Sequence, residues 1–82
     1  MAYKVFENGV ACGYLVSTGR VDKSWGDGVF TDKKSAEVYA LMWAKGFPKS
    51  LAEKYRQPMD VGVEYDFSFC EIPVWMSIQE VE

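Results

Sequence analysis

Hydrophobic and polar residues alternate along several short stretches of this chain, a pattern typical of β-strands with one buried face. Turn-forming residues separate these stretches; Asn8-Gly9, for example, accepts the positive φ angles of a tight hairpin turn. The most regular alternation places valine, tyrosine or phenylalanine at every second position from Val61 to Phe69. The pattern predicts strands at residues 3–6, 10–17, 20–25, 61–69 and 74–81.

Between the third and fourth strands the spacing changes to that of an amphipathic helix. Ala36, Tyr39, Ala40 and Trp43 recur at intervals of three and four residues, which predicts a helix over residues 33–45 with this stripe against the sheet. Local residues also mark the ends of the helix, because Thr31 or Asp32 is a suitable N-cap and Gly46 stands where glycine commonly ends a helix. A second, shorter helix is expected at residues 49–57, ended by Pro58.

The predicted elements define a fold class. Their order is three strands, a helix, a short helix and two strands, which is typical of α+β proteins whose helices lie on one face of an antiparallel sheet. Residues 20–25 are more polar than the other strands and are expected at an edge. The expected architecture is an antiparallel sheet of four to five strands packed on one amphipathic helix, with a second short helix. A chain of 82 residues fits a single domain, residues 1–82.

Composition excludes several kinds of chemistry. The chain contains no histidine, which removes the commonest general base and the commonest metal ligand. Cys12 and Cys70 are too few for a zinc site and are expected to be reduced, buried residues; a disulfide between them requires neighbouring strands. We therefore expect no catalytic residues, no metal and no cofactor.

No apolar run approaches the roughly 20 residues of a membrane span, and the first residues lack the layout of a signal peptide. These features predict a cytoplasmic protein without a membrane partner.

Charge is distributed unevenly along the chain. Residues 31–57 carry six basic and three acidic side chains, whereas residues 58–82 carry six acidic side chains and no basic one. An acidic face of this kind suits a basic protein surface and is poorly suited to nucleic acid, whose phosphates need a clustered basic face. The alternative is that the charges serve only solubility.

The candidate partner-binding residues combine exposed aromatic anchors with these acids. Tryptophan is a typical interface anchor, and one candidate lies in a glycine-rich loop, although it could instead fold back over the sheet edge. Two of the acids, Glu64 and Asp66, share one face of the predicted strand, where they could form an acid/base couple but are more simply its solvated side. The set is Trp25, Asp27, Asp60, Glu64, Asp66, Glu71 and Trp75.

The predicted long helix also suggests an alternative function. Leu41 and Met42 extend its apolar stripe beyond one face, whereas Lys34, Glu37 and Lys45 mark its solvent side. If Leu41 and Met42 form a seam between two copies, the protein is a small homodimeric structural or regulatory module.

Two short motifs carry a resemblance. Val5-Phe6-Glu7-Asn8-Gly9 forms a predicted hairpin near the start, and Phe30-Thr31-Asp32 leads into the single long helix of a compact acidic body. In these features the first half of the chain resembles small phage-encoded accessory proteins, including the anti-CRISPR inhibitors. The resemblance implies a non-enzymatic inhibitor, acting in the host cytoplasm, that occludes a host surface, often one that binds nucleic acid. It assigns no site residue.

Overall fold

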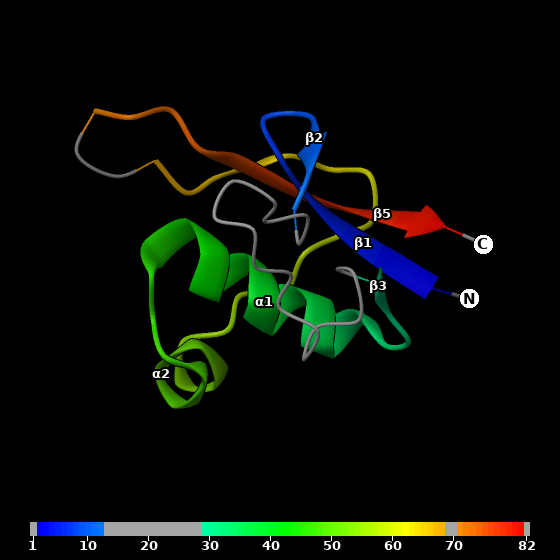
Figure 1. The fold of residues 1–82 in the computed structure, drawn as a ribbon, viewed down its shortest axis with the longest axis horizontal. Coiled ribbons are helices and arrows are strands. Elements are labelled where there is room, and N and C mark those ends of the chain that lie inside the picture. Colours follow the sequence, from blue (N-terminus) through cyan, green and yellow to red (C-terminus); the bar gives the residue numbers. More distant parts are fainter. Residues whose placement is uncertain (1, 13–28, 69–70, 82) are drawn as a thin grey trace, which may run out of the picture.

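The structure, a computed structural model, describes residues 2–12, 29–68 and 71–81. An antiparallel sheet of five strands packs against two helices (Figure 1), which confirms the predicted α+β fold. No helix in these residues is long and apolar enough to span a membrane. In chain order the elements are β1 Ala2–Glu7, β2 Val10–Ala11, β3 Val29–Phe30, α1 Lys33–Lys45, α2 Lys49–Lys54, β4 Tyr65–Asp66 and β5 Trp75–Val81.

The centre of the sheet is the antiparallel pair β1–β5, which is in register from Ala2 opposite Val81 to Glu7 opposite Met76. The far edge of β5 carries β4, and the far edge of β1 carries β2 and β3. The turn between β1 and β2 has φ of 50° at Asn8 and 81° at Gly9. The predicted Asn-Gly hairpin is thereby confirmed.

Helix α1 has the predicted bounds and lies across the sheet. Asp32 occupies the N-cap position without a side-chain hydrogen bond, and Gly46 ends the helix with φ of 70°, donating its N–H to the Met42 carbonyl. This left-handed geometry is why glycine suits the position. The sheet-facing residues Ala36, Tyr39 and Ala40 join Val5, Met76 and Ile78 in the main core cluster.

Helix α2 packs against the apolar residues of α1 that lie outside its sheet-facing stripe. Leu41 is only 7% exposed and packs with Val38 and Ala52 in a second cluster. The residue expected at a dimer seam is therefore buried within the chain. Helix α2 is also shorter than predicted. It ends at Lys54, where the N–H of Tyr55 donates to the Leu51 carbonyl, so Pro58 is not the residue that terminates it.

The predicted strand at residues 61–69 is largely wrong. Val61 forms one isolated parallel bridge with Ile78, after which Gly62 turns the chain with φ of 80° and donates its N–H to the Ile78 carbonyl. The chain then returns antiparallel to β5, where β4 is only two residues long. Val61 and Val63, expected in the core, are exposed because they belong to this turn.

Several predictions lie outside the described residues. They concern most of the predicted strand at 10–17, the strand at 20–25, the Trp25 and Asp27 candidates, and Cys70. Cys12 is described, and it is a buried free thiol that follows β2 and donates its backbone N–H to the Val5 carbonyl at 2.8 Å.

Candidate functional site

Four of the predicted acidic residues lie near the β4 side of the sheet, and we call Asp60, Glu64, Asp66 and Glu71 the acidic edge. All four are exposed. They do not share the flat strand face expected from the sequence, because Asp60 and Glu64 belong to the turn before β4, whereas Glu71 lies between β4 and β5. The structure thus distributes these carboxylates along an edge.

Trp75 is the predicted anchor that the structure places beside this edge. It lies directly opposite Asp66 in the β4–β5 register. Their sequence neighbours point to the helices, since Met76 lies in the core and Tyr65 packs against it. Because side chains alternate between the two faces of a strand, Asp66 and Trp75 project from the face opposite the helices. Trp75 is 43% exposed, a large fraction for tryptophan.

The backbone hydrogen bonds of Trp75 show which type of antiparallel pair it forms with Asp66. Its N–H donates to Asn8 Oδ1 and its carbonyl accepts from the Asn8 N–H, both at 2.8 Å, so both groups point toward β1 and away from β4. The next pair toward the strand end, Phe67 and Val74, carries the hydrogen bond to β4. Asp66 and Trp75 are therefore a non-hydrogen-bonded pair, the kind in which side chains lie closest, with Cβ atoms roughly 4.5–5.5 Å apart.

Asn8 fixes the start of β5 from the opposite end of the chain. Besides its two contacts with Trp75, its side-chain Nδ2 donates to the Pro73 carbonyl at 3.0 Å. The positive φ of Asn8 turns its amide toward this segment. The predicted turn residue is thus also a positioning residue for the exposed tryptophan.

Asp66 is oriented by Ser68. Asp66 Oδ1 accepts the Ser68 backbone N–H at 2.8 Å, while Ser68 Oγ accepts the Val74 N–H at 3.0 Å. Hydrogen bonds from the Ser68 side chain and backbone lower the pKa of Asp66, and the charge of Lys45 adds to this effect. The lowered pKa favours the carboxylate form of Asp66, whose cross-strand partner is Trp75.

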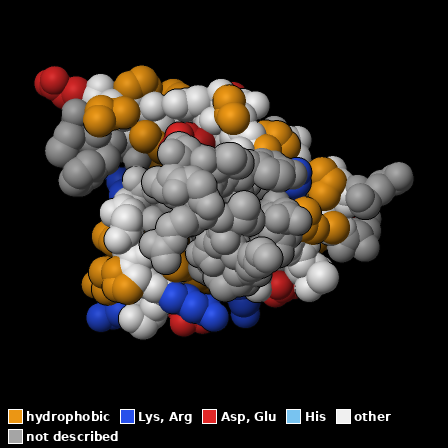
Figure 2. All heavy atoms as spheres, viewed as in Figure 1, with side chains coloured by type: hydrophobic (Ala, Val, Ile, Leu, Met, Phe, Trp, Pro, Cys, Tyr) orange, Lys and Arg blue, Asp and Glu red, His pale blue; other side chains and the backbone are white. Residues whose placement is uncertain are grey.

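Residues 71–74, which lead into β5, project from the body of the molecule at the upper left of Figure 1. Glu71 has φ of 67° there, and Ile72 is 63% exposed. Figure 2 shows an acidic side chain at this tip with hydrophobic side chains beside it. Acidic and apolar surface thus adjoin each other at this end of the sheet.

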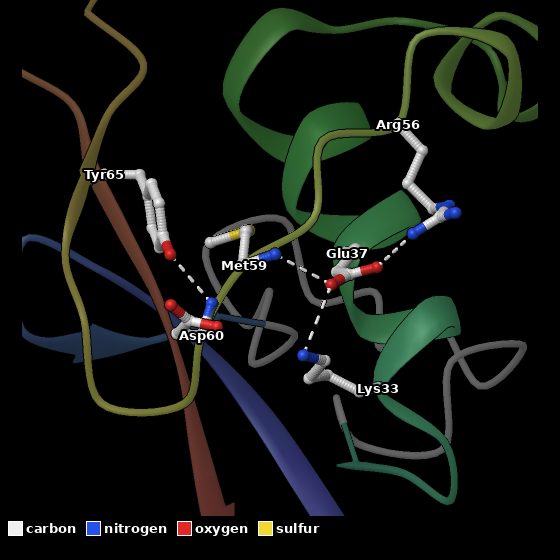
Figure 3. A network of polar contacts seen from close by, with 6 residues as sticks. All are labelled: Lys33, Glu37, Arg56, Met59, Asp60 and Tyr65. Atoms are coloured by element: carbon white, nitrogen blue, oxygen red, sulfur yellow. Dashed lines mark hydrogen bonds and ion pairs between the residues drawn. The ribbon is translucent and has the colours of Figure 1, made fainter.

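A buried carboxylate holds the segment that leads into the acidic edge (Figure 3). The Glu37 side chain is only 2% exposed, although the sequence placed it on the solvent side of the helix. It accepts the Met59 backbone N–H at 2.8 Å, pairs closely with Arg56, and lies 3.9 Å from Lys33 Nζ. Burial of this charge is tolerated because these groups satisfy it.

Tyr65 continues this network to the turn itself. Its hydroxyl accepts the Asp60 N–H at 2.8 Å, which fixes one end of the turn against β4 (Figure 3). The Asp60 carbonyl in turn accepts the Val63 N–H at 3.3 Å. The contacts of Glu37 and Tyr65 therefore determine where Asp60 lies.

The basic side chains lie mainly on the helices. Figure 2 shows them along the lower margin of the molecule, with acidic side chains interspersed. Lys33 and Arg56 are engaged by Glu37, and Lys45 acts electrostatically on Asp66. The helical side is thus partly neutralised, whereas no residue from 58 to 82 is basic.

Sequence reasoning missed Asn8 as a clamp on Trp75 and Glu37 as a buried anchor. The only local signal was the turn-forming type of Asn8, since a glutamate within a helix is usually exposed. In the described part of the chain, no three His, Cys, Asp or Glu residues are grouped so that they could hold a metal ion.

Comparisons with known proteins add no family to this description. No protein-family model, curated protein or solved structure matches the chain. The resemblance to phage accessory proteins therefore remains a hypothesis.

Proposed function

We propose that this protein is a non-enzymatic protein-binding module whose acidic edge docks on a basic surface of a partner protein, with Trp75 as the anchor. The observation that carries the proposal is the pairing of exposed Trp75 with Asp66 across β4 and β5. An aromatic anchor surrounded by charge resembles the centre and rim of protein interfaces, in which a few such residues supply most of the affinity.

The charge distribution supports a basic partner. Asp60, Glu64, Asp66 and Glu71 form an exposed acidic edge in a stretch of sequence that has no basic residue. Complementary charge would speed association and disfavour acidic partners. An inhibitor built this way would compete with nucleic acid for a basic groove, which is the activity we infer for a phage-encoded protein acting in the host cytoplasm.

The experiment compares what the protein captures from a bacterial lysate with what its variants capture. The edge variants are Asp66→Lys and Trp75→Ala, and the matched control is Glu53→Lys, which makes the same charge change at an exposed position of α2. We expect a basic protein that is retained by the wild type and the control but lost with both edge variants.

Affinity measurement with the captured protein then gives a magnitude. Loss of a central tryptophan anchor typically costs at least about 2 kcal/mol, a roughly 30-fold rise in Kd. Binding should also weaken as salt rises above about 0.1 M, where exposed charges are screened beyond roughly 10 Å. Equal retention by the edge variants and the Glu53→Lys control would refute the proposal, and so would an acidic partner.

A further inference from the structure

The Asp66–Trp75 pair has the chemistry to recognise one particular kind of side chain. The indole presents an aromatic face that attracts cations, best when the cation lies over the ring. The neighbouring carboxylate can accept about four hydrogen bonds, and Ser68 uses part of this capacity. Because Asp66 and Trp75 are direct cross-strand partners, their side chains project from the same face of the sheet.

The geometry favours a guanidinium over an ammonium. A guanidinium is flat, so it can stack on the indole while its edge donates two parallel hydrogen bonds to a carboxylate. An ammonium is a compact, strongly hydrated charge that makes neither the stacked contact nor the bidentate one. The close, non-hydrogen-bonded pairing of Asp66 and Trp75 offers both contacts to one planar group.

We propose that the Asp66–Trp75 pair is an arginine receptor, which takes one guanidinium group from the basic surface of the partner. This inference rests on the proposed function and specifies the contact at its centre. Ser68 and Asn8 are positioning residues for it, since Ser68 orients the carboxylate and Asn8 holds the backbone of Trp75.

The test uses short peptides because they isolate this contact from the rest of a partner. ¹⁵N-labelled protein is titrated with acetyl-Gly-Arg-Gly-Arg-Gly-amide and with the same peptide containing lysine. The readouts are the indole N–H of Trp75, assigned with Trp75→Phe, and the backbone N–H of Ser68. The indole N–H of Trp43 is the internal reference, because it donates to Glu7 at 3.0 Å.

We expect saturable shifts at Trp75 and Ser68 with the arginine peptide, with about five-fold weaker binding of the lysine peptide. Asp66→Asn keeps the shape of the side chain and should weaken arginine binding by about ten-fold or more. The control Glu80→Gln removes one exposed acidic charge from β5 and should change binding by less than about two-fold. Unchanged shifts at Ile78 in each variant show that the fold is retained.

The outcomes separate this inference from the proposed function. Equal binding of the two peptides, or equal loss in Asp66→Asn and Glu80→Gln, overturns the arginine receptor and indicates general charge attraction. Such a result leaves the lysate comparison free to succeed through the whole acidic edge. Conversely, the arginine peptide alone could shift Trp75 and Ser68 while the Asp66→Lys variant still captures the same lysate protein as the wild type. That result would uphold the arginine receptor and refute the protein-docking function.

Discussion

Removing the carboxylate of Glu37 should destabilise the protein far more than removing an exposed carboxylate. Glu37→Ala leaves the buried Met59 N–H without its acceptor and Arg56 without its partner. The segment that carries Asp60 also loses its attachment to α1. Both effects arise because the Glu37 side chain is 2% exposed.

The magnitude follows from the exposure of each group. Breaking a fully buried ion pair costs about 3–5 kcal/mol, and an unsatisfied buried N–H costs about 1–3 kcal/mol. The Arg56 side chain is 28% exposed, so part of its charge returns to water when Glu37 is removed. We therefore expect Glu37→Ala to cost about 2–4 kcal/mol of unfolding free energy. Glu37→Gln retains an oxygen acceptor for Met59 and should cost about 1–2 kcal/mol.

Urea unfolding followed by circular dichroism at neutral pH measures these costs. The matched control is Glu53→Ala, which removes an exposed glutamate from α2 and should change stability by at most about 0.5 kcal/mol. A double-mutant cycle with Arg56→Ala should give a coupling energy of at least about 1 kcal/mol. If Glu37→Ala unfolds at the same urea concentration as Glu53→Ala, our interpretation of Glu37 as a structural anchor is wrong.

Three further measurements check other parts of the structure. Asn8→Ala should lower the free energy of unfolding, measured in urea, by about 1–2 kcal/mol, since it removes the side-chain hydrogen bonds to Pro73 and Trp75. An unchanged unfolding free energy would contradict the role of Asn8 as a clamp. Asp66 should titrate in NMR below its ordinary pKa of 3.8, and Ser68→Ala should raise that pKa. Because the folded-state pKa is depressed, the stabilisation from Asp66 is present above the unfolded-state pKa and is lost as pH falls through the folded value. Burial, followed by the charge of Glu7, raises the pKa of Cys12 to about 12. A maleimide should therefore label this buried thiol at pH 7 only after the protein unfolds. Rapid labelling of the native protein would refute the burial of Cys12.

The parts of the fold that the sequence predicted well are those determined by local physics. Helix α1 has the expected bounds because the spacing of apolar residues and the left-handed stop at Gly46 both act within a few residues, although Asp32 occupies the N-cap position without the side-chain hydrogen bond of a capping residue. The turn at Asn8 was predictable for the same reason, since its backbone conformation depends on its own dipeptide.

The errors arose where distant segments decide the outcome. Alternating residues from Val61 predicted a strand, but the chain turns at Gly62, which has a positive φ and donates its N–H to the Ile78 carbonyl. Glu37 was expected to face solvent because its neighbours in sequence do not reveal its partner. Arg56, nineteen residues further on, pairs with the buried carboxylate. For the candidate site, residue types identified Asp66 and Trp75, but only the register of β4 and β5 shows that they face each other.

The central pairing of the sheet also determines the order in which the protein can fold. β1 and β5 lie at opposite ends of the described chain, so a ribosome delivers one strand long before the other. Helix α1 can form as soon as it is synthesised, whereas β1 must wait for its main neighbour until residues 75–81 have left the exit tunnel. A nascent chain stalled before that point would leave the β5-facing edge of β1 unpaired, and the interval before β5 emerges is therefore when this protein most needs chaperones.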